Sequence, residues 1–165
     1  MKIVAYDPNL DSEHFSKLHN GYLKLLNEKD SLKYLSISGV SFDSLIITAL
    51  LKNSKQEEVE YYVALSSDND IIGISAFKPD LIKGFEIIET VVNNKHRFKG
   101  IGKALINEGI ELAKIKGFKA VDISVFADNK DMLILLIKTG FKPIRIENHA
   151  RFDGEDLIHL KKYIR

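Results

Sequence analysis

The chain has 165 residues and a formal net charge of +1, with 45% hydrophobic and 28% charged residues. This composition excludes intrinsic disorder and fibrous repeats, and the charge balance gives no sign of nucleic-acid or acidic-membrane binding. Because the chain has no cysteine, disulfides, thiol nucleophiles and zinc ribbons are excluded. We expect one domain over residues 1–165, with neither a secretory signal nor a transmembrane segment, and therefore a cytoplasmic protein.

The first third of the chain predicts a short strand at residues 2–6 and then two helices. Apolar residues recur at steps of three and four from Phe15 to Leu26, which indicates one face of a helix. A second helix is expected to begin near residues 41–43, whereas residues 28–40 show no clear period. The residues expected to face inward from this second helix are Leu45, Ile46, Ala49 and Leu50.

The remaining chain predicts strands that are interrupted by two helices. The strand-and-helix unit between residues 85 and 126 implies a parallel pair joined by a crossover, and the other strands favour antiparallel pairing. The sequence therefore predicts an α/β (α+β in some schemes) domain with a single mixed, mostly antiparallel sheet flanked by helices. Strands are expected near residues 59–65, 71–77, 85–92, 119–126, 142–147 and 157–163, and helices near 101–116 and 130–139.

A glycine-bearing basic segment lies between an expected strand and an expected helix. In that position the first N–H groups of the helix have no partner, and the helix dipole adds partial positive charge. Two glycines leave room for a phosphate, and three basic side chains add full charges. The segment predicts a pyrophosphate cradle. Its residues are Arg97, Phe98, Lys99, Gly100, Ile101, Gly102 and Lys103.

Three other phosphate-binding patterns fit this segment less well. A Walker loop needs a glycine where Arg97 stands, and a Rossmann fingerprint needs one where Leu105 stands. The glycines also resemble the hairpin of helix-hairpin-helix nucleic-acid binders, which would require a helix just before them. Residues 85–92 are rich in β-branched side chains and indicate a strand instead.

The pattern Arg97-x-x-Gly100-x-Gly102 resembles the coenzyme A pyrophosphate loop of the GNAT superfamily of N-acetyltransferases. Asn129, followed by Gly140-Phe141, is similar to a second motif of that family. The resemblance extends over nearly the whole chain, and the expected element order is that of the family. It implies that acetyl-CoA is the co-substrate and an amine is the acceptor.

The resemblance also implies a splayed sheet, in which the pantetheine arm lies between the strands at residues 85–92 and 119–126. The Val92 backbone would bind that arm, with Val91 next to it, and the Thr90 N–H would stabilise the oxyanion. Asn129 would bind the cofactor or cap the last helix.

The chemistry requires a base, because an ammonium group has no lone pair with which to attack a thioester. By its position before Arg97, Glu86 resembles the catalytic glutamate of the histone-acetylating branch. A plain surface charge is the alternative reading of Glu86. Strand alternation places Glu89 on the opposite face, so that both can serve one cleft only if the strand contains a bulge.

One position departs from the family pattern. Many members carry a tyrosine that protonates the leaving thiolate at the place where Leu136 stands here.

Together, the motifs and the family resemblance predict an acetyl-CoA-dependent N-acetyltransferase that acts on a primary amine of a small molecule or peptide, without a metal. A non-catalytic acetyl-CoA sensor is the main alternative. The sequence leaves open which amine is the acceptor and whether the protein forms a homodimer. The acidic residues within 151–156 are a further candidate contact for the amine.

Overall fold

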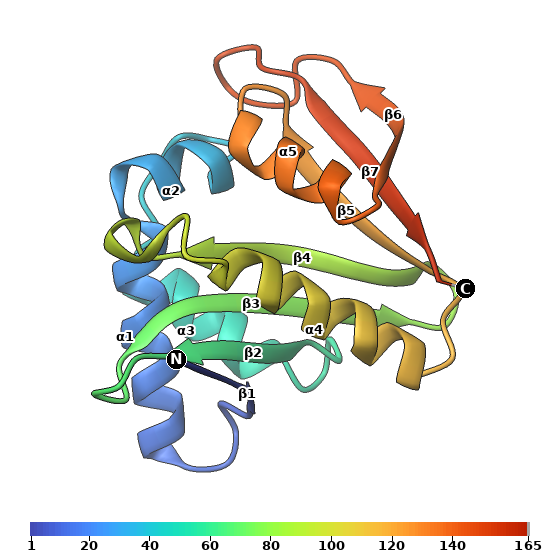
Figure 1. The fold of residues 1–165 in the computed structure, drawn as a ribbon. Coiled ribbons are helices and arrows are strands. Elements are labelled where there is room, and N and C mark those ends of the chain that lie inside the picture. Colours follow the sequence, from blue (N-terminus) through green and yellow to red (C-terminus); the bar gives the residue numbers. More distant parts are fainter. Residues whose placement is uncertain (165) are drawn as a thin grey trace.

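A mixed β-sheet organises the chain, and the computed structural model describes it over residues 1–164 (Figure 1). The strands are β1 (Lys2–Tyr6), β2 (Glu60–Leu65), β3 (Ile71–Asp80), β4 (Gly84–Val92), β5 (Ala120–Phe126), β6 (Lys142–Glu147) and β7 (Leu157–Tyr163). The helices are α1 (Ser12–Leu26), α2 (Lys29–Leu35), α3 (Ser44–Asn53), the short 3-10 helix η1 (Asn94–His96), α4 (Ile101–Ile115) and α5 (Lys130–Lys138). No helix within residues 1–164 is both long and apolar enough to cross a bilayer.

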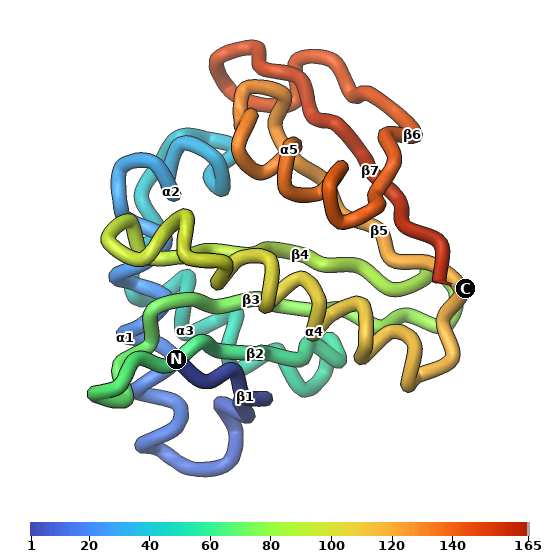
Figure 2. Tube along the Cα trace, in the orientation of Figure 1, coloured from blue at the N-terminus to red at the C-terminus, as the bar shows by residue number. Residues whose placement is uncertain are grey.

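The strands follow the order β1-β2-β3-β4-β5-β7-β6 across the sheet. Neighbours pair antiparallel except β4 and β5, which are parallel, as expected for a strand-helix-strand unit. The predicted fold class is confirmed. Figure 2 shows that the strands β4 and β5 diverge from each other beyond the ends at which they are paired.

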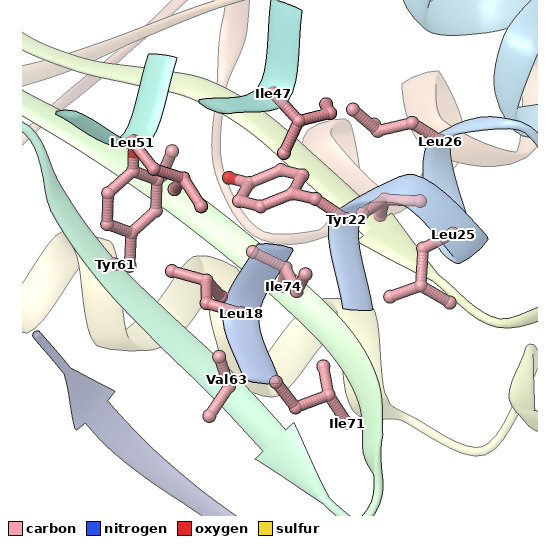
Figure 3. Close-up of a cluster of buried hydrophobic side chains, with 12 residues drawn as sticks. Leu18, Tyr22, Leu25, Leu26, Ile47, Leu51, Tyr61, Val63, Ile71 and Ile74 are labelled. Atoms are coloured by element: carbon pink, nitrogen blue, oxygen red, sulfur yellow. The ribbon is translucent and has the colours of Figure 1, made fainter. Parts of the chain in front are cut away.

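Helices cover the two faces of the sheet with separate cores. On one face α1 and α3 pack over β2 and β3, where Leu18, Tyr22 and Ile47 lie among the buried side chains (Figure 3). On the other face α4 and α5 cover β3, β4 and β5, with Phe77 and Ile106 fully buried between them. We call these two layers the α1 core and the α4 core.

The first third of the chain corrects two details of the sequence prediction. A further helix, α2, occupies part of the stretch that showed no period; at seven residues it is too short to display one. In α3 the buried positions are Ile47 and Leu51, whereas Leu45 and Leu50 are 79% and 52% exposed. The inward face predicted for this helix was therefore wrong. An almost uniformly apolar helix gives no contrast between faces, so its sequence does not fix which one is buried.

Candidate functional site

The two parallel strands separate near their middle. β4 and β5 pair only at Phe85 with Val121, Glu86 with Asp122 and Ile87 with Ile123. Beyond Ile87 the edge of β4 that faces β5 has no strand partner, so main-chain groups there are free to bind a ligand. The splay implied by the family resemblance is therefore present.

A cavity of about 400 Å³ lies at this opening. Its walls come from the end of β4, the segment before α4, the start of α5 and, from the first third of the chain, α2. We call it the cofactor cavity. It brings together most of the candidate residues, because Thr90, Val91, Val92, Arg97, Phe98, Gly100, Ile101, Gly102, Lys103 and Asn129 all line it.

The N-terminus of α4 forms one wall of the cofactor cavity. Gly100 precedes the helix with a φ of +81°, and apart from its two chain neighbours no residue in 1–164 comes within 4 Å of where its Cβ would stand. Ile101 is only 3% exposed, so that it offers its backbone to the cavity while its side chain packs in the core. Free amides, open space and the helix dipole make this wall suited to a phosphate group.

The basic side chains of this segment do not all point into the cradle. The Arg97 guanidinium donates through Nε to the Val92 carbonyl at 3.1 Å and through NH2 to Ser31 Oγ at 3.0 Å. Lys99 Nζ donates to the Lys95 carbonyl at 3.0 Å. Arg97 therefore attaches the loop to α2 and occupies one lone pair of the Val92 carbonyl, where the sequence alone indicated a charge aimed at phosphate.

The start of α5 forms another wall. The Asn129 side chain accepts from the Met132 N–H at 3.3 Å, so it caps the helix while also lining the cavity. Leu136 is fully buried in the α4 core, whereas Met132 and Leu135 face the cavity. No hydroxyl group is offered from position 136, in agreement with the sequence.

A β-bulge changes the faces of β4. Ala76 pairs with Glu89 and Phe77 pairs with Ile87, so Ile88 has no partner on β3. Before the bulge, Ile87 packs in the α4 core; after it, Val91 packs in the α1 core. The bulge that the sequence alternation required is therefore present, and Glu86 and Glu89 face the same side of the sheet.

The two glutamates differ in their surroundings. Glu86 is exposed and lies beside Asp122, and its pKa is raised by partial desolvation and by the charge of that neighbour. Glu89 is more enclosed, and desolvation raises its pKa to about 6. The buried Tyr22 hydroxyl lies nearby and opposes this rise, although it has no hydrogen-bond partner of good geometry within residues 1–164.

Ser75 holds the bulge in place from β3. Its hydroxyl lies 2.9 Å from the Glu89 carbonyl oxygen and 2.8 Å from Thr90 Oγ1. The Thr90 side chain is therefore engaged within the sheet, so any contact with a ligand falls to its backbone.

A buried arginine ties together the loops beside the cofactor cavity. Arg151 is 4% exposed, and its guanidinium binds Asp128 at 2.8 and 3.1 Å, Asp153 at 2.8 and 2.9 Å, and the Lys33 carbonyl at 3.2 Å. The bonds to Arg151 lower the pKa of the Asp128 and Asp153 carboxyls. Asp153 is therefore committed to an internal ion pair and is a poor contact for an acceptor amine.

Sequence reasoning missed the wall that α2 provides. Ser31, Tyr34 and Leu35 line the cofactor cavity, and of these Ser31 and Tyr34 carry hydroxyl groups. The spacing within residues 28–40 gave no sign of a helix, and only the folded chain brings this segment beside β4. His96, at the end of η1, also lines the cavity.

Comparison with known proteins identifies the family. The sequence pattern described as the acetyltransferase (GNAT) family matches residues 28–141. An N-alpha-acetyltransferase of Sulfurisphaera tokodaii is 27% identical over 118 residues, which are 64% of this chain and 70% of the relative. A spermidine N(1)-acetyltransferase of Thermoplasma acidophilum is 29% identical over 122 residues, covering 68% and 72%.

Among solved structures, a GNAT family acetyltransferase from Elizabethkingia anophelis with acetyl-CoA bound superposes with a TM-score of 0.62 at 26% identity, over 70% of this chain and 82% of that one. The matched segment of the family pattern includes α2, the bulged strand β4 and the cradle at the start of α4. The chain is a member of the acetyltransferase (GNAT) family, and it is an acyltransferase.

Proposed function

We propose that this protein transfers the acetyl group of acetyl-CoA to a primary amine by direct attack within a ternary complex. The observation that carries the proposal is the cofactor cavity, which joins the free edge of β4 to the N-terminus of α4. Such a cavity offers main-chain groups to an extended arm at one end and amides to a diphosphate at the other. A relative that binds acetyl-CoA and relatives named for amine acetylation support this assignment.

In this proposal the cofactor is held mainly by backbone groups. The amides around Gly100, Ile101 and Gly102 bind the diphosphate, and the exposed side chain of Lys103, which lines the cavity, adds positive charge. The edge of β4 at Val91 and Val92 binds the pantetheine arm. Phe98, which is 87% exposed, offers an apolar surface beside the cradle, and Asn129, the N-cap of α5, bounds the arm from the opposite wall.

Glu89 is better placed than Glu86 to accept the amine proton. Glu89 precedes Thr90, which lines the cofactor cavity, whereas Glu86 lies four residues from Thr90 and lines a different cavity. A pKa of about 6 leaves Glu89 mostly ionised at neutral pH and still able to take a proton from an amine as it attacks. We therefore assign the base to Glu89 and leave Glu86 without that role.

The remaining chemistry falls to Thr90 and Tyr34. The Thr90 N–H stabilises the negative charge that develops on the carbonyl oxygen. As the new C–N bond forms and the C–S bond breaks, the amine proton goes to Glu89 and the thiolate gains a proton. Tyr34 is a lining residue of the cavity that carries a hydroxyl group, and it is our candidate donor in place of the missing tyrosine at position 136.

The proposal is tested in two steps. In this proposal acetyl-CoA binds the folded state and not the unfolded state, so it must raise the melting temperature. An unchanged melting temperature would contradict the proposal. Release of free thiol with a panel of primary amines then separates an enzyme from a non-catalytic sensor, because a sensor would show the thermal shift without any thiol release. The nucleic-acid alternative requires an α-helix before the glycines, whereas the strand β4 and the three-residue 3-10 helix η1 precede them.

A further inference from the structure

A second cavity, of about 340 Å³, lies at the start of β4. Its walls include Lys83, Glu86, Asp122, Ile144, Arg145 and His159. Within residues 1–164 none of its lining residues belongs to the cofactor cavity, and no helix supplies a lining residue. We call it the distal cavity.

The bulge of β4 puts the distal cavity on the same face as the proposed base. Glu86 and Glu89 face the same side of the sheet because Ile88 is the extra residue between them. Three residues of extended strand separate the two carboxylates by about 10 Å. A ligand that presents an amine to Glu89 can therefore reach Glu86 along the strand only if it is long.

Most charges in the distal cavity are already compensated. Lys78 is paired with Glu57 at 2.6 Å, and Asp122 is paired with Lys161 at 3.2 Å. Arg145 is paired with Glu147 at 3.7 Å and also donates to His159 at 2.8 Å. Glu86 differs from these, because within residues 1–164 it has no cation at ion-pair distance.

The surroundings of Glu86 favour an amine over an extended peptide as the ligand. Around Glu86 the strand β4 is paired on both sides, with Lys78 on β3 and Asp122 on β5, so it offers no free main-chain edge. Recognition must therefore come from side chains. Ile144, which lines the cavity, is 53% exposed and provides apolar surface for the hydrocarbon part of a ligand.

We propose that the distal cavity binds a second ammonium group of the acceptor, so that the preferred substrates are long unbranched diamines or polyamines. Glu86 holds the distal ammonium, and the chain of methylene groups runs along β4 to the amine at Glu89. This inference rests on the proposed acetyl transfer. Lys83, an exposed cation of the same cavity, opposes binding of the second positive charge.

Calorimetric titration of the protein with octylamine, 1,3-diaminopropane and 1,8-diaminooctane tests the inference without turnover. We expect 1,8-diaminooctane to bind most tightly, because only it combines length with a second charge. Glu86→Gln should weaken its binding about fivefold, as expected for a partly exposed ion pair. Lys83→Gln should strengthen that binding, and Glu111→Gln on α4, outside both cavities, should leave it unchanged.

The same variants in a thiol-release assay link binding to turnover. The ratio of kcat/KM for 1,8-diaminooctane to that for octylamine should fall about fivefold in Glu86→Gln. Equal affinity of the wild-type protein for the two amines, or an unchanged affinity in Glu86→Gln, would overturn the inference. If octylamine is still acetylated in that case, the proposed acetyl transfer stands; if no amine is acetylated but the diamine binds through Glu86, the acetyl transfer fails and the distal cavity stands.

Discussion

Ile87 and Val91 lie four positions apart on one strand, yet they pack on opposite faces of the sheet. Without the bulge at Ile88 they would share a face, and Glu89 would point away from the side that Glu86 faces. The bulge therefore places both carboxylates on one side of the sheet, and of the two Glu89 is the one next to Thr90, which lines the cofactor cavity. The cost of the bulge is a partly buried acid with a raised pKa.

Replacing Glu89 should remove the acid limb of the pH–rate profile. At saturating amine we expect the kcat of the wild-type enzyme to rise through an apparent pKa near 6, as Glu89 loses its proton. Glu89→Gln should lower kcat at neutral pH by about a hundredfold, which is typical of a lost general base. Steady-state thiol release between acidic and mildly alkaline pH measures both effects.

Glu86→Gln is the matched control for that experiment. If Glu89 is the base, this variant should keep the limb near pH 6. The opposite result, in which the limb survives in Glu89→Gln and disappears in Glu86→Gln, would return the role to Glu86. The two substitutions are equal in size and lie on the same strand, so a general loss of structure would not distinguish them.

The same Glu89→Gln substitution should stabilise the protein. A folded-state pKa of about 6 is higher than that of an unfolded glutamate, so the folded protein holds the proton more tightly. Ionised Glu89 therefore lowers the free energy of unfolding of the wild-type protein. This penalty is absent below the unfolded pKa of glutamate, grows as the pH rises through the folded pKa of Glu89, and is complete above it. We expect up to about 2 kcal/mol of added stability at pH 7.5 and almost none at pH 4. Urea unfolding at the two pH values would contradict this explanation if the gain were equal at both.

The sequence was sufficient for the strands and for the glycine-bearing turn that opens α4, because both depend on local signals. Gly100 and Gly102 lie at a strand-to-helix junction whose amides are unpaired in any fold of that order. The final strands, β6 and β7, also have the predicted limits. These features required no knowledge of which distant residues approach one another.

Other parts of the site depend on packing that a linear pattern does not contain. The bulge arises from the register between β3 and β4, and nothing in the run from Phe85 to Val92 marks Ile88 as the extra residue. Arg97 turns toward α2 because Ser31 stands there to accept its hydrogen bond. The same tertiary approach brings Tyr34 into the cofactor cavity.

Tyr34→Phe should slow turnover without disturbing the binding of acetyl-CoA. The substitution removes only the hydroxyl group that we assign to protonation of the thiolate. Because a thiol has a pKa of about 8.5, the thiolate is a fair leaving group and we expect a loss in kcat of about tenfold or less. Stopped-flow thiol release and the thermal shift with acetyl-CoA separate the two properties, and a kcat equal to that of the wild-type enzyme would exclude this role for Tyr34.

Gly102→Asp should abolish cofactor binding in a protein that still folds. A Cβ at this position would lie 3.5 Å from Leu135 and 3.9 Å from Val92, which are ordinary contacts, and an acidic residue is favourable in the first turn of a helix. The new carboxylate would lie beside the diphosphate. Two like unit charges about 4 Å apart repel by about 4 kcal/mol at an effective dielectric constant of about 20. We expect the thermal shift with acetyl-CoA to disappear.

Gly102→Ala is the matched control for the charge. It adds the same Cβ without a carboxylate, so it should keep the thermal shift and should be as stable as the wild-type protein or slightly more so, because alanine favours helix. Loss of the shift in both variants would mean that space, and not charge, limits the cradle. Retention of the shift in Gly102→Asp would place the diphosphate elsewhere and contradict the assignment of this helix N-terminus.

Arg151→Met should destabilise the protein in a way that depends on pH. Arg151 is buried, and its removal leaves the Asp128 and Asp153 carboxylates, which are 23% and 43% exposed, without their main partner. Because water reaches these carboxylates, we expect a loss of about 2 kcal/mol at pH 7, below the usual 3–5 kcal/mol for a broken buried pair. The substitution also removes the hydrogen bond that the Lys33 carbonyl of α2 accepts from Arg151.

The lowered pKa values of the two carboxyls stabilise the wild-type protein above the unfolded pKa of aspartate, and this contribution is lost as the pH falls toward the folded values. The difference between the two proteins in urea unfolding should therefore shrink from pH 7 to pH 3, and a constant difference would show that Arg151 acts through packing on the Phe126 ring, 4.9 Å away, instead of through its charge.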